Sequence, residues 1–153
     1  MSFGSLSAKA IDSLNKGVQI ADAYHNTGEG GLSPYHSNGG DVVFHFGTGY
    51  FGVRAQDGGF SMEKMIKLVE DNPFIRAIEV KLSQGAKPGK GGVLPGAKIT
   101  PEIAKIRGVE VGKTVLSPPT HKAFSNVPEL VGFIEDIAAV SYTHLTLPTK
   151  RIV

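Results

Sequence analysis

The sequence predicts an α/β chain, because helical and strand-like patterns alternate along it and glycine-rich loops follow the strands. Glycine is the unusual component: 20 of the 153 residues are glycine, well above the usual share of ~7%. Ten of them fall between 28 and 59 and five between 85 and 96, interleaved with apolar residues. This distribution favours loops in which the backbone comes close to another group, rather than flexible linkers.

The first half of the chain contains two predicted helices and one extended segment. Apolar residues three and four positions apart, after a serine cap, predict a helix over 7–24. The segment 26–31 (NTGEGG) ends it, and the β-prone, glycine-punctuated segment 41–53 is expected to be extended or hairpin-like. Ser61 caps a second helix, which ends at Asn72 because the residue before a proline avoids the helical region.

The second half continues with two strands and two helices. Alternating apolar residues predict a strand over 76–82, followed by a loop over 83–96. A threonine cap, a proline at the first position and a glycine stop define a helix over 100–108. A short strand over 114–116 and an amphipathic helix over 128–139 complete the pattern. In βα barrels the loops that follow the strands form the catalytic face.

The C-terminal tail does not continue the pattern of the last helix. Translated back into DNA, residues 140–149 (VSYTHLTLPT) match a transposon end and adaptor used in preparing sequencing libraries. We therefore expect 140–153 to be non-native and the native sequence to stop near Ala139. The alternative is an ordinary β-prone C-terminal strand. The net charge of +2 then comes from Lys150 and Arg151, since residues 1–139 carry 14 basic and 14 acidic groups.

Composition excludes several classes of protein. A balanced charge argues against a chain whose main task is to bind nucleic acid or an anionic membrane. The chain has no cysteine, which excludes a disulfide framework, a thiolate metal site within it and a cysteine nucleophile. No apolar run approaches the ~20 residues that span a bilayer, and the N-terminus lacks the features of a signal peptide. We expect a cytoplasmic protein.

Two glycine-rich loops carry candidate chemistry. The segment 85–92 (GAKPGKGG) lacks the serine or threonine of an ATP-binding P-loop, and no dinucleotide-binding glycine motif is present. Lys87, on a loop stiffened by proline, suits an anion or a polarised ring, whereas Lys90 is expected at the surface; a solvated loop is the alternative for both. Glu29, among three glycines, is either a solvated turn residue or a carboxylate that orients an amine or imine.

The five histidines have no metal-ligand spacing, so no metal site is predicted. His45, between two phenylalanines, is expected to be a packed core residue, and His121, after a strand end, could face a site. His25 and His36 flank the first glycine loop and stay ambiguous, and His144 belongs to the tail. No nucleophile-elbow motif is present either.

Five motifs occur in a fixed order: MSFGS at 1–5, NTGEGG at 26–31, GYFGV at 49–53, QGAKPGKGGVLPG at 84–96 and SPPTH at 117–121. With them the chain, over residues 1–139, resembles the FMN-binding central domain of glutamate synthase, and particularly the shorter stand-alone proteins of that type. The resemblance implies a (β/α)8 TIM barrel, of which this chain would be about the first half. It also implies that reduced FMN delivers a hydride to 2-iminoglutarate, formed from 2-oxoglutarate and ammonia, to give glutamate.

The resemblance assigns roles to individual residues. Lys87 would stabilise the anionic reduced flavin, and Glu29 would be the second catalytic residue. Arg107, which by itself indicates only a helix C-terminal cation, would bind a carboxylate of 2-oxoglutarate, together with Glu29 and Gln84 as substrate-binding residues. The cofactor-binding residues would be Met1, Ser2, Gly4, Thr27, Thr48, Gln84 and Lys87.

Some positions depart from the family pattern. Leu32–His36 (LSPYH) stands where the classical enzymes continue with an acidic segment, and Lys90 and Val93 stand where they usually carry Glu and Gln. These departures weaken any inference about an ammonia tunnel or ferredoxin docking. An electron donor, either ferredoxin or an NAD(P)H-linked subunit, and an iron–sulfur cluster would belong to the full-length protein. A complete barrel needs ~250 residues, so we expect the chain alone to be inactive.

Two alternative functions stay open from the sequence. One is a related amine-handling flavoenzyme, such as an N-methylglutamate-forming type, which would share all of these motifs. The other is a non-catalytic, glycine-rich binding module. Substitution of Gln84, Lys87 and Arg107 by alanine in the full-length protein distinguishes the binding module from the two enzymes. A non-catalytic module predicts that these substitutions leave turnover unaffected.

Overall fold

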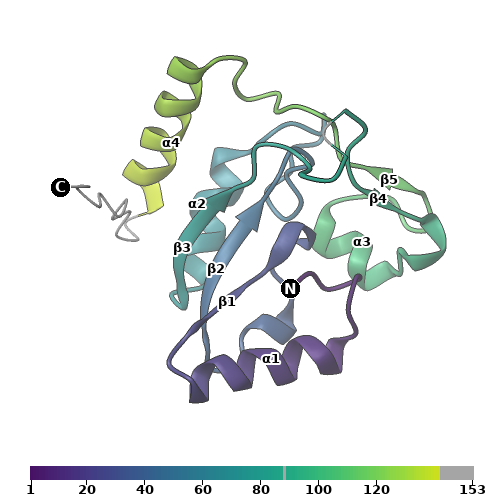
Figure 1. Cartoon of the computed structure of the whole chain (residues 1–153), viewed down its shortest axis with the longest axis vertical. Helices are drawn as coiled ribbons and strands as arrows, with labels where there is room; N and C mark the ends of the chain where they lie inside the picture. Colours follow the sequence, from purple (N-terminus) through teal and green to yellow (C-terminus); the bar gives the residue numbers. More distant parts are fainter. Residues whose placement is uncertain (88, 142–153) are drawn as a thin grey trace.

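A computed structural model describes residues 1–87 and 89–141 of the chain. Its centre is a sheet of three parallel strands in the order β1 (Tyr24–Asn26), β2 (Asp41–Phe46) and β3 (Ile75–Val80). Helix α2 (Met62–Asp71) connects β2 to β3, as expected for parallel neighbours, which need a crossover connection. The structure is therefore α/β, in agreement with the sequence (Figure 1).

The remaining elements surround this sheet. Helix α1 (Ala8–Ile20) lies below it in Figure 1, and α4 (Val127–Ser141) lies at the upper left and contacts α2. To the right, α3 (Pro101–Arg107) lies beside a small antiparallel pair. That pair consists of β4 (Val93–Leu94) and β5 (Val115–Leu116), and the 3-10 turns are η1 (Gly28–Gly30), η2 (Pro34–His36) and η3 (Gly96–Lys98).

The predicted helix caps are confirmed. The side chains of Ser7, Ser61 and Thr100 each accept a hydrogen bond, at 3.3 Å, from the backbone N–H three residues further on. Gly108 ends α3 with a φ of 67°, a left-handed conformation that glycine adopts without the steric cost of a Cβ. Local sequence therefore determines where these helices begin and where α3 ends.

Two expectations for the first half need correction. The first helix ends at Ile20 rather than at Tyr24, because Asp22 has a φ of 50° and Tyr24 opens strand β1. That strand has only three residues, too few for a recognisable alternation. For 41–53 the extended alternative is confirmed only over 41–46, which form β2, because residues 47–53 form turns. The hairpin alternative is wrong, since β2 pairs in parallel on both sides. The predicted strand at 114–116 exists as β5 but pairs with β4.

Two apolar clusters hold the elements together. The larger joins the sheet to α2 and α4 through Phe44, Phe46, Met65, Phe133 and Ile137. The smaller joins the N-terminal segment to α1 and α3 through Phe3, Ile11, Ile99, Ile103 and Ala104. Burial of Phe3 beside α3 places Ser2 next to the C-terminal end of that helix.

The tail that we expect to be non-native begins within α4, which extends to Ser141. The rest of the tail, from 142 onward, falls outside the described residues. Within 1–87 and 89–141, no helix combines the length and the apolar character needed to cross a membrane.

Candidate functional site

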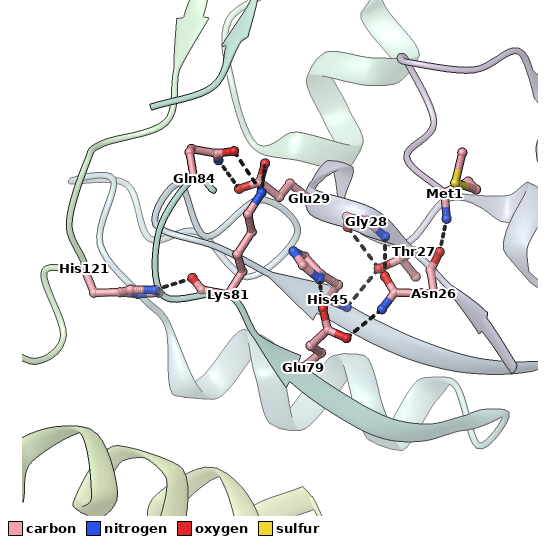
Figure 2. A network of polar contacts seen from close by, with 10 residues as sticks. All are labelled: Met1, Asn26, Thr27, Gly28, Glu29, His45, Glu79, Lys81, Gln84 and His121. Carbon is pink, nitrogen blue, oxygen red and sulfur yellow. Dashed lines mark hydrogen bonds and ion pairs between the residues drawn. The ribbon is translucent and has the colours of Figure 1, made fainter. Parts of the chain in front are cut away.

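Polar side chains gather where the three parallel strands end. Glu29 follows β1, Thr48 follows β2, and Lys81 and Gln84 follow β3. Because the carboxyl ends of parallel strands meet at the same edge of a sheet, Glu29, Lys81 and Gln84 come together although Glu29 is far from the other two in sequence. Figure 2 shows Glu29, Lys81 and Gln84 pointing toward one another at this edge.

Glu29, Lys81 and Gln84 form a closed ring of polar contacts. The Gln84 side chain donates from Nε2 to Glu29 Oε1 at 2.6 Å and accepts at Oε1 from Lys81 Nζ at 2.8 Å. Lys81 Nζ also lies 3.2 Å from Glu29 Oε2. Both carboxylate oxygens of Glu29 therefore have a partner, and the carboxylate is held in one orientation (Figure 2).

Glycines make room for this carboxylate. A Cβ at Gly47, immediately after β2, would lie 2.5 Å from Glu29 Oε1. Gly28, with a φ of 62°, turns the chain into η1, and its N–H donates to Asn26 Oδ1 at 2.8 Å. The glycine excess of the sequence thus has the predicted cause here, because the backbone approaches a functional side chain closely.

Arg107 lies at the end of α3 and is buried, with 5% of its surface exposed. Its Nη2 donates to Ser2 Oγ at 3.1 Å and to the Phe3 carbonyl oxygen at 3.3 Å, and the guanidinium lies over the ring of Phe51 at 5.1 Å. Burial lowers the pKa of Arg107, and the negative charge of Glu29 acts in the opposite direction. Arg107 Nε has no hydrogen-bond partner among the residues that the structure describes.

A cavity of about 150 Å³ lies between these groups, with Ser2, Glu29, Phe51, Arg107 and Ser117 on its wall. A cavity of ~150 Å³ is large enough for a small organic molecule such as benzene. Here the wall carries a cation and a carboxylate, so it suits a small polar molecule with a negative group and a hydrogen-bond donor. Two larger pockets, of about 710 Å³ and 420 Å³, have neither Glu29 nor Arg107 on their walls.

The other sequence-predicted residues occupy varied places. Met1 donates from its amino group to the Asn26 carbonyl oxygen, and Gly4, with a φ of 98°, packs against α3. The hydroxyls of Thr27 and Thr48 are buried and donate to backbone carbonyl oxygens, those of Gly28 and Pro118. Lys87 is exposed on the loop after β3. The structure thus brings together Ser2, Glu29, Gln84 and Arg107.

The histidines belong mainly to the framework. His45 is buried and contacts Glu79 on the neighbouring strand, as expected for a packed residue. Its backbone N–H donates to Thr27 Oγ1 at 2.9 Å. His36 is buried, and its Nε2 contacts the Met1 carbonyl oxygen at 2.9 Å. His121 contacts the carbonyl oxygen of Lys81, the residue that holds Glu29. Among the described parts of the chain, no group of three histidine or acidic residues is arranged to hold a metal ion.

Sequence reasoning missed Lys81. The alternation of apolar and polar residues in 76–82 identified Lys81 only as a polar position of a strand. The strand ends at Val80 rather than at 82, which makes Lys81 the first residue after β3, where side chains at the carboxyl ends of parallel strands reach the site edge.

Comparison with known proteins places the chain in a protein family. The model of a protein family described as a conserved region in glutamate synthase matches residues 1–148. The chain belongs to this family. Members with curated names include the glutamate synthase large subunit-like protein YerD of Bacillus subtilis, 47% identical over 142 residues, which covers 92% of this chain and 27% of YerD.

Two further relatives are more distant. The large chain of the NADPH glutamate synthase of Bacillus subtilis is 34% identical, over 90% of this chain and 9% of that protein. The archaeal-type NADPH glutamate synthase of Thermotoga sp. (strain RQ2) is 36% identical, over 85% of this chain and 23% of that protein. The chain therefore spans about a quarter or less of the length of these relatives.

Proposed function

We propose that this chain forms part of the FMN-dependent site of a glutamate-synthase-like oxidoreductase that reduces 2-iminoglutarate, formed from 2-oxoglutarate and ammonia, to glutamate. The observation that carries the proposal is the 150 Å³ cavity with Arg107 and Glu29 on its wall. Membership of the glutamate synthase family supports it independently.

Arg107 would bind one carboxylate of the dicarboxylate substrate. Its planar guanidinium matches a carboxylate, and Ser2, Phe3 and Phe51 fix its plane. Its Nε is buried without a partner among the described residues, which costs about 1–3 kcal/mol, and a bound carboxylate would recover part of that cost. A neutral ligand would form weaker hydrogen bonds with Arg107 than a carboxylate does.

Glu29 would receive the nitrogen end of the substrate. Its carboxylate accepts hydrogen bonds, so it suits the N–H groups of ammonia or of an imine, and Lys81 and Gln84 keep it in place. Gln84 would contribute its amide to the same end of the site. Arg107 and Glu29 on one cavity wall would therefore orient a molecule with a carboxylate at one end and an imine at the other.

The donor set at the sheet edge fits FMN in chemical type. The ammonium groups of Lys81 and Lys87 and the amide of Gln84 all follow β3, and they would stabilise the negative charge of a reduced flavin. When bound, FMN would supply the hydride. The residues that would hold it are Met1, Ser2, Gly4, Thr27, Thr48, Gln84 and Lys87.

The fold part of the proposal is a βα barrel. The three strands follow one another across the sheet in sequence order, without the reversal of a doubly wound sheet, and the candidate residues lie at their carboxyl ends. We place these strands in the first half of such a barrel, with the electron donor, ferredoxin or an NAD(P)H-linked subunit, bound by the full-length protein. We also propose that this part alone neither holds FMN tightly nor turns over, and a stoichiometric flavin spectrum from purified residues 1–139 would contradict the first of these statements.

The decisive experiment compares two arginines that lie over the same phenylalanine. In the full-length protein, Arg107→Lys should raise the KM for 2-oxoglutarate about 10- to 100-fold, since one charge-assisted hydrogen bond is worth about 1.5–3 kcal/mol. Arg54→Lys is the matched control, because the Arg54 guanidinium lies 6.0 Å from the Phe51 ring but Arg54 does not line the cavity. An equal effect of both variants would refute a substrate role for Arg107.

The products separate the remaining functions. Glutamate from 2-oxoglutarate and ammonia supports the proposal, whereas N-methylglutamate formed only with methylamine indicates the related amine-handling enzyme. Unchanged turnover after alanine substitution of Gln84, Lys87 and Arg107 indicates a non-catalytic module.

A further inference from the structure

Tyr50 has an unusual backbone conformation for a large residue. Its φ is 51°, in the left-handed region that glycine and asparagine prefer, and its side chain is completely buried. Such strained positions persist where the surrounding structure requires them, and they are frequent at functional sites. The turn after β2 brings the Tyr50 hydroxyl to residues 121–123, about 70 positions further along the chain.

The hydrogen bonds around His121 define which ring nitrogen carries the proton. The Lys81 carbonyl oxygen can only accept, so His121 Nε2, at 2.8 Å, donates to it. His121 Nδ1 is then the acceptor of a hydrogen bond that the Tyr50 hydroxyl donates, at 3.0 Å. The Tyr50 oxygen itself accepts from the backbone N–H groups of Lys122 and Ala123, at 3.0 Å and 3.1 Å. Every polar atom in this chain of contacts is used.

These contacts fix the backbone of Lys81 on both sides. Its N–H donates to the carbonyl oxygen of Phe46 at 2.9 Å, and its carbonyl oxygen accepts from His121. A lysine side chain is flexible, so its reach depends on where its backbone is held. From this fixed point the ammonium group contacts Glu29 and Gln84 (Figure 2).

We propose that Tyr50 and His121 are positioning residues for the site: they hold Lys81 so that its ammonium group orients the carboxylate of Glu29 and the amide of Gln84. Neither residue lies on the wall of the 150 Å³ cavity, so both act through Lys81. The consequence for catalysis rests on the proposed function, whereas the positioning of Lys81 is a property of the structure that is measurable without turnover.

The test uses the full-length protein and three substitutions. His121→Phe keeps an aromatic ring but removes both hydrogen bonds, and His121→Gln restores a donor for the Lys81 carbonyl oxygen. His25→Phe is the matched control, because His25 is equally a buried histidine, yet neither ring nitrogen has a partner among the described residues. Two measurements are made: hydrogen exchange of peptides that cover 79–87, and the kcat and KM for 2-oxoglutarate with ammonia.

For His121→Phe we expect faster exchange at 79–87 and a loss in kcat/KM of roughly 10- to 100-fold, since small misplacements at a site cost about this much. We expect His121→Gln to recover most of both, and His25→Phe at pH 8 to change neither. Unchanged exchange at 79–87 in His121→Phe, or equal behaviour of the Phe and Gln variants, would overturn the proposal.

Two further outcomes are also decisive. If His121→Phe does not fold, Tyr50→Phe replaces it, because it removes only the hydroxyl: faster exchange at 79–87 supports the proposal, and unchanged exchange overturns it. If the wild-type protein does not convert 2-oxoglutarate and ammonia, the proposed function fails, and the exchange comparison alone decides whether Tyr50 and His121 position Lys81.

Discussion

His25 is a buried histidine whose protonation the fold opposes. Only 4% of its surface is exposed, and neither ring nitrogen has a hydrogen-bond partner within the described residues. Its ring lies 5.0 Å from that of His36. Burial, with smaller contributions from the amino group of Met1 and from His36, lowers the pKa of His25 from 6.5 to about 4. The folded chain therefore keeps His25 neutral at pH values where the unfolded chain protonates it.

This difference makes stability depend on pH. Below pH 6.5 the unfolded state binds a proton that the folded state binds only near pH 4, so the free energy of unfolding falls as the pH decreases through this window. With these two pKa values, His25 alone lowers the free energy of unfolding by about 2 kcal/mol between pH 8 and pH 5. Burial lowers the pKa values of His36 and His121 as well, so both act in the same direction.

The assay is urea unfolding of wild type and His25→Phe at pH 8 and pH 5. Phenylalanine keeps a planar aromatic ring and His25 has no hydrogen bond to lose among the described residues, so the two proteins should differ little at pH 8. At pH 5 the variant should be more stable than wild type by about 2 kcal/mol. Equal losses for both proteins between pH 8 and pH 5 would refute the assignment of this pH dependence to His25.

Three further substitutions test the local geometry. Gly47→Ala should raise the KM for 2-oxoglutarate in the full-length protein, because its Cβ would lie 2.5 Å from Glu29 Oε1. Gly17→Ala is the control, because its Cβ meets no described atom within 4 Å. In thermal unfolding this control should increase the free energy of unfolding by about 0.5–1 kcal/mol. Thr100→Ala should lower the free energy of unfolding in urea by about 1 kcal/mol through loss of the α3 cap. Thr100→Ser should retain most of the wild-type stability, because serine also caps helices. Gly91→Ala should lower the melting temperature, because its Cβ would collide with the Ser117 carbonyl oxygen and its φ is 77°; an unchanged melting temperature would contradict this reasoning.

Local signals in the sequence predicted much of the fold. Ser7, Ser61 and Thr100 cap helices where expected, and Gly108 ends one, since capping involves only residues a few positions apart. The first strand was missed because three residues carry no periodicity. The partner of β5 could not be predicted either, since a two-residue strand does not indicate with which other strand it pairs.

The candidate site was predicted in part. The motifs identified Glu29, Gln84 and Arg107, and the structure places all three at one edge of the sheet or on the cavity beside it. Lys81 and Tyr50 were not identified, because a lysine at a strand end and a tyrosine after a glycine are ordinary in sequence. Their importance arises from contacts with residues that only the folded chain brings near.

The sequence by itself determined the α/β class, the helix boundaries set by caps and stops, and membership of the family through five ordered motifs. The tertiary structure alone decided how the site is held. Gln84 meets Glu29 across 55 positions and Arg107 meets Ser2 across 105, because three parallel strands end at one edge and Phe3 is buried beside α3. Short-range patterns encode helix ends, whereas the ring of Glu29, Lys81 and Gln84 exists only once distant segments pack together.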